Sequence, residues 1–194
     1  PAAPSAPSPR DVAAAGGLRA AAGPAAEVDV VCAPPVDELY PDLGSADGPI
    51  VRVTSGRIGT VLEGASRPGH FDGVLTVVLK LLHLVRPDVA VFGAKDAQQL
   101  LAVRRMVAGV DLDVEVLAVE TVREADGLAR SSRNAYLTPA EHEHALALSR
   151  ALRAGRDAAA AGEGAPSVLA AARGILEATD GVDVDNVVLG DPAT

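Results

Sequence analysis

Residues 88–99 read Asp-Val-Ala-Val-Phe-Gly-Ala-Lys-Asp-Ala-Gln-Gln, and this stretch decides the fold. Its first half is a β-branched run that ends in glycine, which predicts a short strand. Residues 97–108 follow with apolar side chains at helical spacing, and residues 114–119 predict a second strand. Strand, helix and strand with short connections are typical of a βαβ unit. The sequence therefore predicts an α/β fold with a parallel sheet.

Toward the N-terminus, three further apolar runs predict regular elements. The β-branched runs at 28–32 and 50–54 predict strands. The run at 74–85 is too long for a typical strand and predicts a mostly buried helix. Residues 1–26 are rich in proline and alanine, and we expect a flexible segment there.

Toward the C-terminus, the pattern predicts two helices and a last strand. Thr-Pro-Ala-Glu at 138–141 places a hydroxyl N-cap, a first-turn proline and a glutamate three residues on, which predicts a helix to about residue 160. A second helix is expected at 167–178 and a strand at 182–189. We expect no clear element between residues 122 and 137.

Near residues 120–123 the alternation of apolar strand and helix patterns gives way to a polar stretch, and this change divides the predicted fold. Residues 27–121 form an α/β region on this interpretation, and residues 122–194 form a smaller α+β region. The chain has 194 residues and is 48% hydrophobic, enough for a real core.

Composition excludes several classes of function. The net charge of −9 argues against a nucleic-acid surface, and an aromatic content of 2% argues against base-stacking platforms. No apolar run reaches the roughly 18 residues of a membrane helix. Cys32 is the only cysteine, which excludes an intrachain disulfide and a thiolate zinc cluster, so we expect the reducing cytoplasm.

A candidate ligand site lies where the first strand meets the helix. In open α/β sheets, ligands bind at the carboxyl ends of the strands, here at Gly93. The helix N-terminus offers free N–H groups, and Lys95 adds a cation. Gln99 lies in the first helical turn, where its amide can donate and accept. The alternative is a solvated Lys95–Asp96 ion pair with glutamines that cap the helix, and spacing alone leaves both interpretations open.

A second candidate site is the run Arg-Glu-Ala-Asp-Gly-Leu-Ala-Arg-Ser-Ser-Arg-Asn at 123–134. Guanidinium groups and serine hydroxyls suit phosphate oxygens, and a long loop at a domain joint suits a mobile lid over a nucleotide. The alternative is a polar connector whose arginines pair with Glu124 and Asp126. The cluster stands out in an acidic chain, which favours the functional interpretation.

Two other motifs favour structural roles. Arg-Pro-Gly-His-Phe at 67–71 predicts a turn, with His70 either at a ligand or at the start of the following helix. Glu-His-Glu-His at 141–144 is not a metal motif, because residues two apart on a helix face different directions, and we interpret it as a solvated face.

Five motifs occur in order along the chain. They are Arg-Pro-Gly-His-Phe at 67–71, Gly-Val-Leu-Thr-Val-Val-Leu-Lys-Leu-Leu at 73–82, Phe-Gly-x-Lys-Asp-x-Gln-Gln at 92–99, Thr-Val-Arg-Glu-x-Asp-Gly-Leu-Ala at 121–129 and Ser-Ser-Arg-Asn-x-Tyr-Leu at 131–137. Together they resemble the pantothenate synthetase (pantoate–β-alanine ligase) family. The resemblance implies a Rossmann-like domain with a smaller closing domain, in a cytoplasmic homodimer that uses ATP and Mg²⁺.

The resemblance also implies a reaction. ATP activates pantoate as a pantoyl adenylate with release of pyrophosphate, and the β-alanine amine then displaces AMP. Carried over motif by motif, Lys95 lies on the phosphates and Gln99 binds pantoate. The remaining implied positions are Gly93, Ala94 and Asp96 in the ATP site, the Val122 backbone against adenine, and Arg130, Ser131, Ser132 and Arg133 in a flexible phosphate-binding segment.

Several family features differ here. The Pro-Thr-Met-Gly and His-x-Gly-His signatures, and a strand ending Phe-Val-Asn-Pro, are expected before residue 1, so an N-terminal portion is expected to be missing. Ala94, Ala97 and Arg130 replace the usual glutamate, aromatic residue and methionine. Two alternatives therefore stay open: a non-catalytic remnant that acts in association, with an exposed apolar sheet face, or an adenylate-forming amide ligase for a different acid.

Overall fold

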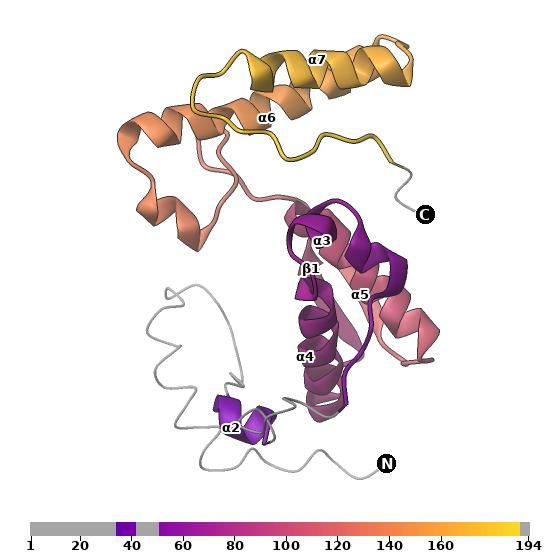
Figure 1. Cartoon of the computed structure of the whole chain (residues 1–194). Helices are drawn as coiled ribbons and strands as arrows, with labels where there is room; N and C mark the ends of the chain where they lie inside the picture. The colour runs from indigo at the N-terminus through magenta and orange to yellow at the C-terminus, as the bar shows by residue number, and fades with distance from the viewer. Residues whose placement is uncertain (1–33, 42–50, 191–194) are drawn as a thin grey trace. The chain divides into compact units, whose positions relative to one another are not determined.

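The computed structural model describes residues 34–41 and 51–190 (Figure 1). The chain divides into two compact units, residues 1–52 and 53–194. The first contains the short helix α2 (Val36–Leu39). The flexible segment predicted at 1–26 and the strand predicted at 28–32 lie outside the described residues. The domain joint predicted near residues 120–123 stays a prediction.

The predicted βαβ unit is confirmed. Strands β1 (Val89–Gly93) and β2 (Glu115–Val119) pair in parallel, with Val91 opposite Leu117. Helix α5 (Ala97–Gly109) connects them after a 3₁₀ turn, η2 (Ala94–Asp96). The α/β fold class therefore holds, with a two-stranded parallel sheet among the described residues.

One face of this sheet packs on two helices. Helix α4 (His70–Val85) lies beside α5 (Figure 1), and the most deeply buried large side chains are Phe71 and Val103, one from each helix. From the sheet, Ala90, Phe92 and Val116 pack against the same core. The helix predicted at 74–85 is thus confirmed, and its start lies at His70, after the turn at Gly69 (φ 78°).

The opposite face of the sheet is apolar and exposed. Its side chains alternate with the core-facing ones, as the two-residue period of a strand requires. Each of them is more than two-fifths exposed: Val89, Val91, Leu117 and Val119.

The strand predicted at 50–54 is wrong for the described residues 51–54, which form an irregular segment before η1 (Gly56–Thr60) and α3 (Glu63–Ser66). The reason is where the backbone N–H groups are bonded. The Val53 amide donates to Thr76 Oγ1 at 2.9 Å, and the Ser55 amide donates to Asp72 Oδ1 at 2.7 Å. Both acceptors are on α4, so no neighbouring strand receives these donors.

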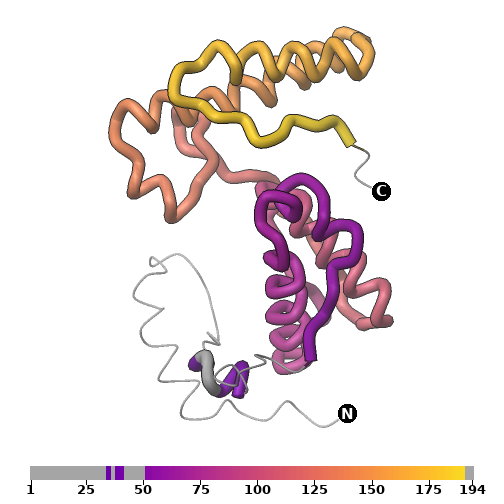
Figure 2. Tube along the Cα trace, viewed as in Figure 1, coloured from indigo at the N-terminus to yellow at the C-terminus, as the bar shows by residue number. Residues whose placement is uncertain are grey.

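The C-terminal part of the described chain is helical. Helix α6 (Pro139–Ala160) starts with the predicted capping box, in which Thr138 and Glu141 exchange hydrogen bonds. Helix α7 (Ala165–Glu177) packs along it (Figure 2). Small residues allow the close approach: a Cβ on Gly155 would lie 3.6 Å from the Cβ of Ala172. None of the helices between residues 34 and 41 or 51 and 190 is long and apolar enough to cross a membrane.

The strand predicted at 182–189 is wrong. These residues form an irregular segment whose Val182, Val184 and Val187 pack against the α6–α7 core. The Arg173 guanidinium anchors the segment by donating to the Val187 carbonyl at 3.2 Å. Among the described residues the smaller region therefore contains α6, α7 and an isolated antiparallel bridge between Arg123 and Ala129.

Candidate functional site

The first candidate segment runs from the end of β1 into α5. Lys95 lies in η2, where its Nζ is 3.6 Å from Asp96 Oδ2, and the two side chains are 40% and 56% exposed. No side chain caps the N-terminus of α5, and Gln99 is half-buried in its first turn. The segment thus combines free helix N–H groups, an exposed cation and an amide, which suits an anionic ligand. The Lys95–Asp96 ion pair of the alternative interpretation is also present.

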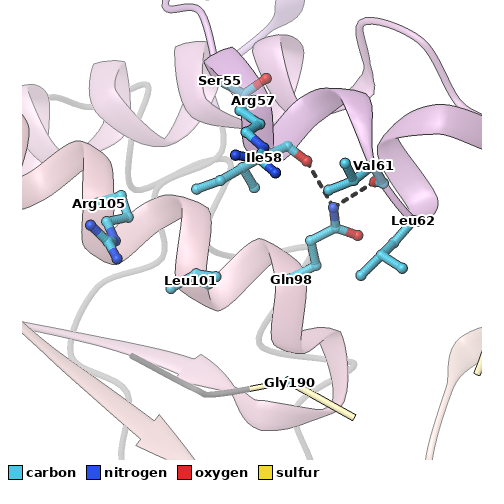
Figure 3. Close-up of a pocket in the computed structure, with 9 residues that line it drawn as sticks. All are labelled: Ser55, Arg57, Ile58, Val61, Leu62, Gln98, Leu101, Arg105 and Gly190. Carbon is cyan, nitrogen blue, oxygen red and sulfur yellow. Dashed lines mark hydrogen bonds between the residues drawn. The ribbon is translucent and has the colours of Figure 1, made fainter. Parts of the chain in front are cut away.

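Gln98 has a role that the sequence did not indicate. Its Nε2 donates to the carbonyls of Ile58 and Val61, both at 2.8 Å (Figure 3). Its Oε1 accepts from the Glu63 amide at 3.2 Å. The carboxamide therefore does not cap α5 and instead holds the η1–α3 segment against it. No spacing signal reveals this, because the partners are backbone groups 35 to 40 residues away.

The turn before α4 is a small network of charged side chains. Arg67 Nη1 is 2.8 Å from Glu63 Oε1 and 3.2 Å from His70 Nε2, and the His70 ring lies 5.2 Å from that of Phe71. The turn predicted at 67–71 is present, and His70 starts the helix without capping it.

Two cavities lie beside these elements. One of about 720 Å³ borders Gln98 (Figure 3), and one of about 460 Å³ lies at the N-terminus of α4, next to Asp72. Neither is lined by Lys95 or by Ser131–Arg133. The larger is lined by Ser55, Arg57, Ile58, Val61, Leu62, Gln98, Leu101, Arg105 and Gly190.

The second candidate segment begins with a small hairpin, where no element was predicted. Arg123 and Ala129 form an antiparallel bridge around Gly127, whose φ of 100° suits glycine. Arg130 pairs with Glu124 through two contacts, at 3.1 and 3.3 Å. This ion pair was expected on the connector interpretation, and it engages one of the predicted ATP-binding arginines.

The serine–arginine segment follows the hairpin. Ser131 Oγ accepts from the Arg133 amide at 3.2 Å and so starts the 3₁₀ turn η3 (Ser132–Tyr136). Ser132 and Arg133 are exposed, and within the described part of the chain the Arg133 guanidinium makes no hydrogen bond or ion pair. The Val122 carbonyl, predicted near adenine, accepts from the Arg130 amide at 2.9 Å.

Two carboxyl groups have lowered pKa values, Glu141 at the start of α6 and Asp126 in the hairpin. Hydrogen bonds from the Thr138 backbone and side chain lower the pKa of Glu141. The hydrogen bond from His142 and that from the Leu128 amide lower the pKa of Asp126. The solvated face predicted at 141–144 is confirmed for Glu141 and Glu143, which are exposed, whereas His142 and His144 are half-buried. Among the described residues, no group of three or more His, Cys, Asp or Glu side chains could hold a metal ion.

The structure thus forms each candidate segment separately. No hydrogen bond or ion pair among the described residues joins 93–99 to 121–134, and each segment leaves a cation exposed, Lys95 in one and Arg133 in the other.

Comparison with known proteins decides the family. The sequence model for pantoate–β-alanine ligase matches residues 13–194. The chain belongs to the pantoate–β-alanine ligase family. It is 61% identical over 165 residues to pantothenate synthetase 4 of Frankia alni, which covers 85% of this chain and 52% of that protein. It is 59% identical over 172 residues to pantothenate synthetase of Thermobifida fusca, covering 86% of this chain and 57% of that protein.

Solved structures of the family are similar to this one. Pantothenate synthetase from Thermus thermophilus superposes with a TM-score of 0.81 at 45% identity, over 95% of this chain and 64% of that one. Pantoate–β-alanine ligase from Francisella tularensis, complexed with β,γ-ATP and β-alanine, gives a TM-score of 0.53 at 38% identity, over 60% of this chain and 43% of that one. The chain spans about half the length of the curated relatives it matches.

Proposed function

We propose that this chain acts in the ATP-dependent condensation of pantoate with β-alanine to pantothenate. The pantoate carboxylate attacks the α-phosphorus of ATP, which forms pantoyl adenylate and expels pyrophosphate. The β-alanine amine then attacks the acyl carbon, forms the amide bond and expels AMP. Family membership carries this proposal, and the ATP and β-alanine bound to the Francisella relative support it.

Lys95 and Arg133 are the residues we propose on the phosphates. The attack adds negative charge to the α-phosphate and to the departing pyrophosphate, and fixed cations stabilise this charge. Lys95 stands at the carboxyl end of β1, and the Arg133 guanidinium is free to donate to a phosphate. Little acid–base chemistry is needed, so positioning supplies much of the rate.

The other roles are assigned by motif. Gln99 binds pantoate, and the Val122 backbone contacts adenine with its remaining hydrogen-bonding capacity. Gly93, Ala94, Asp96, Arg130, Ser131 and Ser132 complete the ATP site. Arg130 reaches a phosphate only if it leaves Glu124, with which it pairs at 3.1 Å.

The carboxylates near Lys95 fit magnesium only in part. Asp96 is the exposed oxygen ligand in this segment, and Mg²⁺ commonly combines one or two carboxylates with substrate phosphates and water. We propose that Mg²⁺ would be held by the triphosphate with Asp96 and would neutralise phosphate charge. The homodimer and the cytoplasmic location implied by the resemblance are further proposals.

Two assays test the reaction one half at a time. Pantoate-dependent exchange of labelled pyrophosphate into ATP measures adenylation, and β-alanine-dependent AMP release measures the complete reaction. When these assays are applied to Lys95→Ala, Arg156→Gln is the matched control, because this exposed arginine pairs only with its neighbour Asp157 on α6. Exchange that requires pantoate would support the proposed reaction. Exchange with other hydroxy acids only would favour altered specificity, and no exchange with any acid would favour a non-catalytic remnant.

A further inference from the structure

A hydrogen bond between His142 and Asp126 joins the hairpin to helix α6. His142 Nε2 lies 2.6 Å from Asp126 Oδ2, and the two side chains are about one-third exposed. The other oxygen of Asp126 accepts from the Leu128 amide at 2.9 Å. One carboxylate therefore closes the hairpin turn with one oxygen and attaches it to α6 with the other.

Gly127, in the same turn of the hairpin, also packs against helix α6. Gly127 is buried, and a Cβ at this position would clash with the Arg153 guanidinium and lie 3.2 Å from Ser149 Oγ. Arg153 and Ser149 are both on α6. Side chains from three turns of α6 thus hold residues 126–127.

The hairpin in turn holds the serine–arginine segment. Asn134 Nδ2 donates to the Ala129 carbonyl at 2.9 Å, and the Asn134 amide donates to the Ser131 carbonyl at 3.1 Å. Ser131–Arg133 is therefore fastened at Asn134 to the last hairpin residue. A shift of the hairpin on α6 would carry Ser131–Arg133 with it.

We propose that His142 is a positioning residue, which acts through Asp126 to hold Ser131–Arg133 where the segment meets the triphosphate of ATP. The ligand in this proposal rests on the proposed function. The positioning itself rests on the contacts of Asp126, Gly127 and Asn134.

The other charged side chains near His142 have partners of their own or are exposed, so Asp126 is the carboxylate that His142 contacts. On the hairpin, Glu124 is paired with Arg130, and the Arg123 guanidinium donates to the Gly127 carbonyl at 3.1 Å. On α6, Glu141 is bonded to Thr138, Glu143 is exposed, and Arg153 lies against Gly127. His144 lies against Gly181.

Amide hydrogen exchange of the 194-residue chain tests the attachment without any ligand. His142→Ala should speed exchange at Gly127, Leu128 and Asn134 by about fivefold, the effect of losing one charge-assisted hydrogen bond near the surface. Protection at Ala147 in the α6–α7 core should stay unchanged. An arginine in place of His142 can donate to the same Asp126 carboxylate, and its charge makes that hydrogen bond charge-assisted. His142→Arg should restore wild-type exchange, and Glu143→Gln is the matched control on the same helix turn.

The affinity for ATP tests the functional part. We expect His142→Ala to weaken ATP binding by about fivefold and His142→Arg to restore it. Faster hairpin exchange with unchanged ATP affinity would overturn the positioning role, and unchanged exchange in His142→Ala would overturn the attachment itself. A wild-type chain that binds no ATP would refute the proposed function, and the exchange experiment would still decide whether His142 holds the segment.

Discussion

Replacing Gln98 with leucine should loosen the η1–α3 segment from helix α5. Leucine has a similar size but removes three hydrogen bonds, two donated at 2.8 Å and one accepted at 3.2 Å. A typical intramolecular hydrogen bond contributes about 1 kcal/mol net. The partner groups at Val61 and Glu63 are exposed and water can replace the amide there, so we expect a loss of about 2 kcal/mol rather than about 3.

Chemical and thermal unfolding measure this loss. A destabilisation of about 2 kcal/mol corresponds to a melting temperature lower by roughly 4–8 °C in a unit of this size. Gln98→Glu keeps the acceptor and loses both donors, so it should retain only the contact with the Glu63 amide and also fall below wild type. Ala108→Ser, at an exposed position on the same helix, is the matched control. If Gln98→Leu lowers the free energy of unfolding by less than about 0.5 kcal/mol, the reasoning is refuted, because the three hydrogen bonds would then make no net contribution to stability.

Three other predictions concern the site and its support. Lys95→Ala should slow pantoate-dependent adenylation roughly 100-fold, or about 3 kcal/mol of lost charge stabilisation, and an unchanged exchange rate would remove Lys95 from the mechanism. Gly127→Ala should destabilise the chain by about 1–3 kcal/mol in urea unfolding because of its φ of 100°, whereas Gly174→Ala, in open space within α7, should stabilise it by about 0.5–1 kcal/mol; equal effects would contradict the structure. The lowered pKa values of Asp126 and Glu141 stabilise the fold above their unfolded values near 4, and this stabilisation is lost as pH falls through the folded pKa values. Asp126→Asn and Glu141→Gln should each flatten the fall of the urea midpoint between pH 5 and 3, and an unaltered slope would exclude these carboxyl groups as its source.

The elements that the sequence predicted are those set by neighbouring residues. The βαβ unit follows from local periodicity and from glycine at residue 93, and the start of α6 follows from four consecutive residues at 138–141. Because these signals do not depend on the rest of the fold, the elements that they predicted are present in the structure.

The elements that the sequence missed depend on distant partners. Val53 is β-branched, as strand residues often are, yet its backbone amide donates a hydrogen bond to Thr76 on α4, 23 residues away. Val182 and Val184 have strand-like alternation, yet they pack on helices rather than beside a strand. A β-branched run therefore indicates strand propensity, but whether it pairs as a strand depends on which surface is available.

The same distinction applies to the candidate site. The sequence singled out Lys95 and Ser131–Arg133 by residue type and position, and the roles of these residues in binding stay predictions. The contacts of Gln98 and His142 were not predicted. Gln98 bonds to a backbone carbonyl 40 residues away and His142 to a hairpin carboxylate, and neither contact produces a periodic pattern in the sequence.

Amide hydrogen exchange across an ATP titration tests most directly whether Lys95 and Ser131–Arg133 hold one triphosphate. We expect residues 93–99 and 130–134 to become protected together, with the same half-saturating ATP concentration, and expect pyrophosphate to protect both segments as well. Protection of only one segment, or of the two at different ATP concentrations, would contradict a shared triphosphate site.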